Sequence, residues 1–124
     1  MRDGTVLRAG VYRPENSEKH PTILFRTPYS KLLAINNDFM NLVDFTFAGY
    51  VLVIQDIRGR FSSEGVWEKE DLFKVEGYDG YDSVEWVTSQ SWCDGNVAMA
   101  GGSYMGFLAW IADMENPPHL RAMQ

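Results

Sequence analysis

A serine between glycines is the residue of this sequence most suited to chemistry. Residues 97–106 read VAMAGGSYMG, which is typical of a short apolar strand, a tight turn and the start of a helix, with Ser103 in the turn. Such a turn presents the serine hydroxyl above a sheet, where a histidine from elsewhere can reach it. The helix that begins at Tyr104 offers free backbone N–H groups and the positive end of its dipole to an oxyanion. The segment predicts a nucleophilic serine.

The spacing of the glycines leaves a simpler interpretation open. The general pattern G-x-S-x-G places its second glycine two residues after the serine, where this chain has Met105, and the glycine follows at Gly106. A serine before a helix also serves as a capping residue with no catalytic part. The order of the surrounding strands and helices is therefore needed to choose between a nucleophilic serine and a capping serine.

The rest of the chain predicts an alternation of strands and helices. We expect strands at 5–12, 22–26, 50–55 and 97–100, and the start of another at 120–124. We expect helices at 37–48, 79–91 and 104–114. This order indicates an α/β fold, a mostly parallel sheet with helices on both faces. Ser103 then lies in the strand–turn–helix context that a nucleophile requires.

Local signals set the expected boundaries of these elements. Gly49 is expected to end the first helix, and Asp79 to cap the second. The buried side of the second helix is predicted to hold Tyr81, Val84, Trp86 and Val87. The remaining segments are predicted as turns or loops: 2–5, 14–21, 56–65, 66–78 and 92–96.

Several segments in register resemble one known family. They are 1–5 (MRDGT), 26–29 (RTPY), 55–59 (QDIRG) with 63–65 (SEG), 79–86 (DGYDSVEW), 92–97 (WCDGNV) and 102–106 (GSYMG). In this order they are similar to the N-terminal part of the X-prolyl dipeptidyl-peptidase and cocaine-esterase-like α/β-hydrolases. In that family the turn that carries the nucleophile has the pattern G-x-S-Y-x-G, which places the second glycine at Gly106.

The resemblance implies an activity and three site residues. Residues 1–124 would be the N-terminal part of an α/β-hydrolase catalytic domain, incomplete without its cap, the rest of its sheet and a C-terminal β-sandwich. Ser103 would be the nucleophile, and the Tyr104 backbone N–H and the Tyr29 phenol would be the oxyanion donors. The implied reaction is hydrolysis of ester or amide bonds through an acyl-enzyme, of the X-Pro dipeptidyl-peptidase or acyl-esterase type. Without the resemblance, Tyr29 would be interpreted as an ordinary core or rim aromatic.

A general base for Ser103 is not evident in this sequence. α/β-Hydrolases carry the nucleophile, the acid and the histidine in that order along the chain. Only His119 follows Ser103, and a ten-residue helix of about 15 Å separates them. His20 precedes the serine in a polar loop. We therefore expect neither histidine to be catalytic and the isolated chain to be inactive.

Two other interpretations stay open on this evidence. The chain is a catalytically silent fragment that associates with a missing C-terminal portion or with another copy of itself, or it is a binding module that kept the fold without the chemistry. The expected partner of the complete protein is a small ester or peptide substrate. The resemblance implies no cofactor and no metal, since every catalytic group is a protein group.

Charge and composition narrow the classes of partner. The net charge is −6 with no basic run, so we expect neither nucleic acid nor an anionic membrane as a partner. No apolar run approaches the roughly 18 residues of a membrane helix. We expect a cytoplasmic location, unless a signal segment upstream of Met1 is missing.

The remaining polar residues are expected to be structural. Asp56 and Arg58 are predicted to pair with local backbone or with each other rather than with substrate. An acidic stretch is predicted to be a solvated face: Glu68, Glu70, Asp71 and Glu76. A second acidic set is predicted to be a cap and surface charge, without metal-ligand spacing: Asp79, Asp82 and Glu85. Cys93 is predicted to be a structural or surface thiol.

Overall fold

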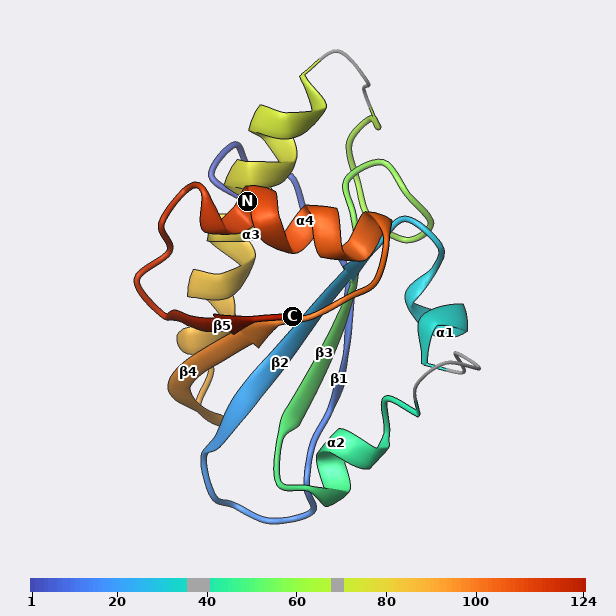
Figure 1. The fold of residues 1–124 in the computed structure, drawn as a ribbon. Coiled ribbons are helices and arrows are strands. Elements are labelled where there is room, and N and C mark those ends of the chain that lie inside the picture. Colours follow the sequence, from blue (N-terminus) through green and yellow to red (C-terminus); the bar gives the residue numbers. More distant parts are fainter. Residues whose placement is uncertain (36–40, 68–70) are drawn as a thin grey trace.

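The computed structural model describes residues 1–35, 41–67 and 71–124, which form a five-stranded sheet with helices on both faces (Figure 1). The strands are β1 (Ala9–Tyr12), β2 (His20–Thr27), β3 (Val51–Asp56), β4 (Cys93–Met99) and β5 (Leu120–Met123). The helices are α1 (Lys31–Ala34), α2 (Asp44–Phe47), α3 (Leu72–Thr88) and α4 (Tyr104–Asp113). The strand order is β1-β3-β2-β4-β5. Only β1 is antiparallel to its neighbour, so the predicted mostly parallel α/β sheet is confirmed.

The two faces of the sheet bury separate sets of apolar side chains. Helices α3 and α4 cover one face, where Leu24 and Val53 contact Val84 of α3 and Ala109 of α4 in one cluster. The segments around α1 and α2 cover the other face, where Phe45 packs against a second cluster. Alternate residues of β2 and β3 face opposite layers, which is why both strands are apolar throughout their middle.

The central position of β2 brings three loops to one edge of the sheet. Strand β2 pairs in parallel with β3, with Thr27 opposite Asp56, and with β4, with Leu24 opposite Met99. The carboxyl ends of the three strands therefore lie side by side. Tyr29 follows β2, Asp56 ends β3, and Ser103 follows β4, so these residues come from neighbouring strands at the edge where open α/β sheets bind their ligands.

The predicted helix at 37–48 is wrong as a single element. Residues 36–40 lie outside the described part of the chain, and of the rest only Asp44–Phe47 is helical. A short helix at Lys31–Ala34, which the sequence did not suggest, precedes it. Leu42 is buried but Phe47 is exposed, so turns rather than one continuous helix bring the apolar side chains onto the sheet. Gly49 follows α2 with φ of 89°, as predicted for the end of a helix.

Helix α3 begins seven residues before the predicted start and includes half of the segment expected to be a loop. Asp79 is therefore not a cap but lies in the middle of the helix, and Trp86 is exposed rather than buried. The residues before Asp79 are charged and aromatic with no clean hydrophobic period, so the sequence did not indicate a helix there. The first half of α3 also holds two glycines, Gly77 and Gly80. Their absence of side chains serves packing, since a Cβ on Gly80 would lie 2.4 Å from the Cβ of Ala112 in α4.

The strand boundaries also differ from the prediction. Strand β1 covers only Ala9–Tyr12, because the backbone before it pairs with the loop after β3, where Glu64 N donates to Val6 O and Arg8 N to Ser63 Oγ. Strand β4 begins at Cys93, inside the segment predicted to be a turn, and the Cys93 side chain is buried. The helix at α4 and the strand at β5 are confirmed within one or two residues.

Candidate active site

Ser103 lies exposed between β4 and α4, in a backbone conformation that non-glycine residues seldom adopt. Its φ is 54° and its ψ is −125°. Backbone strain of this kind is found disproportionately at functional sites. Ser103 is the residue before the first turn of α4, yet its side chain makes no capping hydrogen bond to that helix. The geometry therefore does not support the simpler interpretation of Ser103 as a helix cap.

Two glycines allow the chain to reverse so sharply at Ser103. A Cβ on Gly101 would lie 2.4 Å from the Cβ of Met105, and a Cβ on Gly106 would lie 2.6 Å from the carbonyl oxygen of Gly101. Both separations are shorter than atoms tolerate, so the close approach of strand end and helix start requires glycine at both positions. The required spacing is therefore 101 to 106, which explains why the second glycine follows Met105.

The first turn of α4 leaves a backbone donor beside Ser103. Met105 N donates to Gly102 O at 3.2 Å and Phe107 N donates to Ser103 O at 3.0 Å. Within the described part of the chain, no backbone acceptor takes the N–H of Tyr104. A free N–H at the positive end of a helix is suited to hold a developing negative charge.

Tyr29 lies on the loop after β2, and its side chain is 55% exposed. The backbone of this loop is fixed at several points. Tyr29 N donates to Thr27 Oγ1 at 3.0 Å, and Arg60 Nε donates to Pro28 O at 3.2 Å. Ser30, the next residue, has φ of 81°. Tyr29 is thus exposed on a loop whose backbone is held by hydrogen bonds. This loop follows β2, and the loop that carries Ser103 follows the neighbouring parallel strand β4.

The side chain of Tyr104 is partly buried, with its hydroxyl inaccessible to solvent. It packs in a cluster around Ile57 and Leu108, and its hydroxyl has no hydrogen-bond partner among the described residues. The indole Nε1 of Trp67 is also buried, and it makes no hydrogen bond to any described residue. Burial raises the pKa of Tyr104, the neighbouring indole of Trp67 opposes the shift, and the negative charge of Glu76 adds to it.

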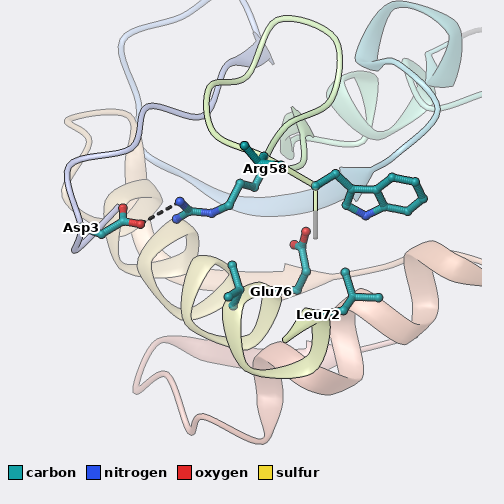
Figure 2. A pocket seen from close by; sticks show the side chains of 7 residues that line it. Asp3, Arg58, Leu72 and Glu76 are labelled. Atoms are coloured by element: carbon teal, nitrogen blue, oxygen red, sulfur yellow. Dashed lines mark hydrogen bonds and ion pairs between the residues drawn. The ribbon is translucent and has the colours of Figure 1, made fainter. Parts of the chain in front are cut away.

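Trp67, which packs against this cluster, also lines a cavity of about 240 Å³ (Figure 2). It is lined by Asp3, Arg58, Val66, Trp67, Leu72, Val75 and Glu76. Figure 2 shows Arg58 and Asp3 joined across one side of it, with Glu76 rising from α3. Because Asp3 pairs with Arg58 and Glu76 pairs with Arg26, which lies outside the lining, these side chains offer no unpaired charge to a ligand.

The charged residues around the cavity form two ion-pair networks that the sequence analysis did not foresee, one buried and one that reaches the surface at Asp3. The Arg26 guanidinium, which is fully buried, donates to Gln55 Oε1 at 3.0 Å, to Glu76 O at 2.8 Å and to Glu76 Oε2 at 2.7 Å. Burial raises the pKa of Glu76, and the Arg26 guanidinium offsets only part of that shift. The predicted solvated face is therefore wrong for Glu76, while Glu68 and Glu70 lie outside the described residues. An arginine within an apolar strand was the available signal, because a buried guanidinium needs an acidic partner.

The second network joins α3 to the N-terminal segment. Arg58 donates to both carboxylate oxygens of Asp79, at 2.8 and 2.7 Å, and to Asp3 at 2.7 Å. Asp79 is 2% exposed, so it is neither a cap nor a surface charge. Asp82 also holds the N-terminal segment, since its carboxylate accepts from Arg2 Nη2 at 2.8 Å. Asp56 accepts from the backbone N–H of Ser62, as the predicted pairing with local backbone requires, and also binds Lys31. The alternative prediction, a pair between Arg58 and Asp56, is wrong, because Arg58 binds Asp79 and Asp3.

The two histidines of the sequence lie at the opposite edge of the sheet from Ser103, and a large separation was predicted for His119. His119 Nδ1 contacts Glu85 Oε2 at 2.9 Å, just before β5 begins, and His20 Nε2 contacts Asn16 Oδ1 at 2.9 Å, where β2 begins. Both positions are at the amino edge of parallel strands, whereas Ser103 lies at the carboxyl edge. Eight residues of β2 alone span about 25 Å.

Two classes of feature are not seen in the described ranges. No three His, Cys, Asp or Glu side chains there are grouped closely enough to share a metal ion. None of the helices in those ranges combines the length and apolar character that crossing a bilayer requires.

Comparison with known proteins settles the family. Residues 3–124 match the family described as X-Pro dipeptidyl-peptidase (S15 family). The chain belongs to this family. The resemblance noted in the sequence is thereby confirmed, and with it the α/β-hydrolase fold.

Relatives of the chain are hydrolases of esters or peptides. The cocaine esterase of Rhodococcus sp. (strain MB1 Bresler) is 40% identical over 126 residues, which cover 99% of this chain and 21% of the esterase. A CocE/NonD family hydrolase from Staphylococcus aureus superimposes with a TM-score of 0.85 at 29% identity, over 99% of this chain and 25% of that protein. An α-amino acid ester hydrolase superimposes with a TM-score of 0.82 at 28% identity, over 99% and 23%. The chain thus spans about a fifth to a quarter of the length of these relatives.

Proposed function

We propose that this chain is the nucleophile-bearing part of a serine hydrolase that cleaves ester or amide bonds through an acyl-enzyme. Ser103 is the nucleophile, and the backbone N–H of Tyr104 and the phenol of Tyr29 stabilise the oxyanion. The observation that carries the proposal is the exposed, strained Ser103 in a strand–helix turn that only glycines at 101 and 106 permit. Membership of a family of peptidases and esterases supports the same reaction class.

The proposed chemistry follows from where negative charge develops. Attack of the Ser103 oxygen on a carbonyl carbon forms a tetrahedral intermediate whose former carbonyl oxygen carries the charge. The free N–H of Tyr104 lies at the start of α4 and donates to that oxygen without needing to reorient. The leaving alcohol or amine departs as the acyl-enzyme forms, and water then releases the acid. Whether the acyl group is a dipeptide ending in proline or a simple acyl ester depends on a pocket outside this chain.

Activity requires a base that these residues do not provide. Each histidine of the sequence is engaged at the opposite edge of the sheet. We therefore propose that the base and its orienting carboxylate belong to a further part of the complete protein, and that the 124-residue chain alone is inactive. We use 'the complete protein' for this chain together with the proposed further part that carries the base.

A fluorophosphonate probe tests the proposal, because it reacts covalently with activated serines. On the complete protein we expect the label at Ser103, and Ser103→Ala should abolish both labelling and ester hydrolysis. Ser91→Ala, at an exposed serine outside this edge, is the matched control and should leave both unchanged. Wild-type hydrolysis by the Ser103→Ala protein would reject Ser103 as nucleophile. Hydrolysis by the isolated chain above the uncatalysed rate would reject the assignment of the base to another part.

A further inference from the structure

We propose that Asp56 is a positioning residue that holds the Tyr29 loop in the conformation needed for oxyanion stabilisation. The inference rests on the proposed function, since it takes the Tyr29 phenol as a donor. Asp56 does not contact the reacting atoms. It acts through the backbone of the loop between β2 and α1.

The Asp56 carboxylate is completely buried and saturated with donors. Its Oδ1 accepts from Lys31 N at 2.7 Å. Its Oδ2 accepts from Lys31 Nζ at 2.7 Å, from Ser62 Oγ at 2.8 Å and from Ser62 N at 3.3 Å. Lys31 Nζ also contacts Ser62 Oγ. One carboxylate therefore ties the loop after β2 to the loop after β3.

These bonds lie where the loop is strained. Ser30, between Tyr29 and Lys31, has φ of 81° and ψ of 123°, a conformation that a serine adopts only when its surroundings impose it. On one side, Tyr29 N is held by Thr27 Oγ1 at 3.0 Å. On the other side, Lys31 N is held by Asp56. The two bonds bracket the strained residue, so loss of the second would let Ser30 relax and carry Tyr29 with it.

The hydrogen-bond donors around position 56 require a carboxylate there, and a neutral acceptor would not satisfy them. Both oxygens of Asp56 face donors, and one of the donors is an ammonium group. An asparagine would present its amide N–H₂ to either Lys31 N–H or Lys31 Nζ, and donor would face donor. Burial raises the pKa of Asp56, but the hydrogen bonds from Lys31 and Ser62 outweigh it and hold the pKa below its usual range. The carboxylate is therefore ionised wherever the protein is folded near neutral pH.

A small displacement of Tyr29 has a large effect on rate. An oxyanion donor acts only when it is already at hydrogen-bond distance from the charge that develops in the transition state, and misplacement by about 1 Å costs about a hundredfold. Binding of substrate depends on other groups. Loosening the loop should therefore lower kcat more than it raises KM.

The test is a double-mutant cycle in the complete protein, with Asp56→Asn, Tyr29→Phe and the combination. We expect Asp56→Asn alone to lower kcat about 10- to 100-fold, with KM changed less than about threefold. In the Tyr29→Phe background the same change should lower kcat less than about threefold, because the donor it positions is already gone. Asp94→Asn, an exposed aspartate at the amino end of β4, is the matched control.

The outcomes separate this inference from the proposed function. Full activity of Asp56→Asn, or equal losses in both backgrounds, overturns the positioning role while leaving Ser103 as nucleophile. A purely structural role would lower the unfolding temperature and reduce activity equally in both backgrounds. If Asp56→Asn does not fold, Asp56→Glu replaces it in the cycle, because it keeps a negative charge for Lys31 Nζ but displaces the oxygen that accepts from Lys31 N. Unchanged fluorophosphonate labelling of Ser103→Ala would instead reject the proposed function.

Discussion

The α-carbon of Gly106 faces the carbonyl oxygen of Gly101 so closely that an added methyl carbon would lie 2.6 Å from that oxygen. Gly106 is in the first turn of α4, and Gly101 lies in the loop that leaves β4. Their contact fixes the angle at which the helix leaves the sheet. It thereby fixes where Ser103, between them, presents its hydroxyl.

Gly106→Ala should therefore destabilise the protein more than Gly102→Ala. The methyl group at 106 meets backbone that cannot move aside, so we expect a loss of about 1–3 kcal/mol, typical of overpacking. A Cβ on Gly102 has no neighbour within 4 Å among the described residues, and its φ does not require glycine, so its substitution should change stability by less than about 1 kcal/mol. Urea unfolding of the complete protein measures both. Equal destabilisation by the two substitutions would contradict the assigned contact.

The contact between Gly80 and Ala112 sets how closely α3 packs on α4. A Cβ on Gly80 would lie 2.4 Å from that of Ala112, so Gly80→Ala should separate the helices and cost about 1–3 kcal/mol. Ala112→Gly removes the opposing methyl group and should restore part of the loss in the double mutant. Thermal unfolding of the single and double mutants checks the coupling. Strictly additive losses would show that the two positions do not meet.

The buried pair of Arg26 and Glu76 should be costly to break. Glu76→Leu leaves the fully buried guanidinium of Arg26 without its carboxylate, and we expect a loss of about 3–5 kcal/mol. Replacing both charges, in Arg26→Met with Glu76→Leu, leaves no unpaired charge and should recover much of that stability. Denaturant unfolding of the wild type, Arg26→Met, Glu76→Leu and the double mutant forms the cycle. A double mutant no more stable than Glu76→Leu would contradict this expectation, because Arg26 would then stabilise the fold without its carboxylate partner.

Acid should weaken the attachment of the N-terminal segment. Burial raises the pKa of Asp82, but hydrogen bonds from Arg2 outweigh it and hold the pKa below its usual value. Because the folded pKa lies below the unfolded value of about 3.9, the stabilisation is present above that pH and is lost as pH falls through the folded pKa. Asp82→Asn should thus lower stability at pH 7 and differ progressively less from wild type below about pH 4. A difference that stays constant from pH 7 to 2 would contradict this assignment.

The sequence was sufficient to predict that the histidines lie away from Ser103, but it did not predict the networks of ion pairs around α3. That His119 and His20 lie away from Ser103 followed from helix length and chain order, which are local quantities. The burial of Glu76 and Asp79 did not follow, because acidic residues on a helix with glycines are typical of a solvated face. Only the packing of α3 against α4 and the loop after β3 gives those carboxylates their arginine partners.

The sequence by itself determined the alternating elements, the parallel core strands, the glycine-flanked serine and, through motifs in register, the family. These are encoded in periodicity and turn chemistry over a few residues. The tertiary structure decided that the loops after β2, β3 and β4 meet, that Asp56 binds Lys31 beside the strained Ser30, and that Gly101 touches Gly106. Such relationships depend on strand order and on approaches of a few ångströms between distant segments, and no local pattern specifies them.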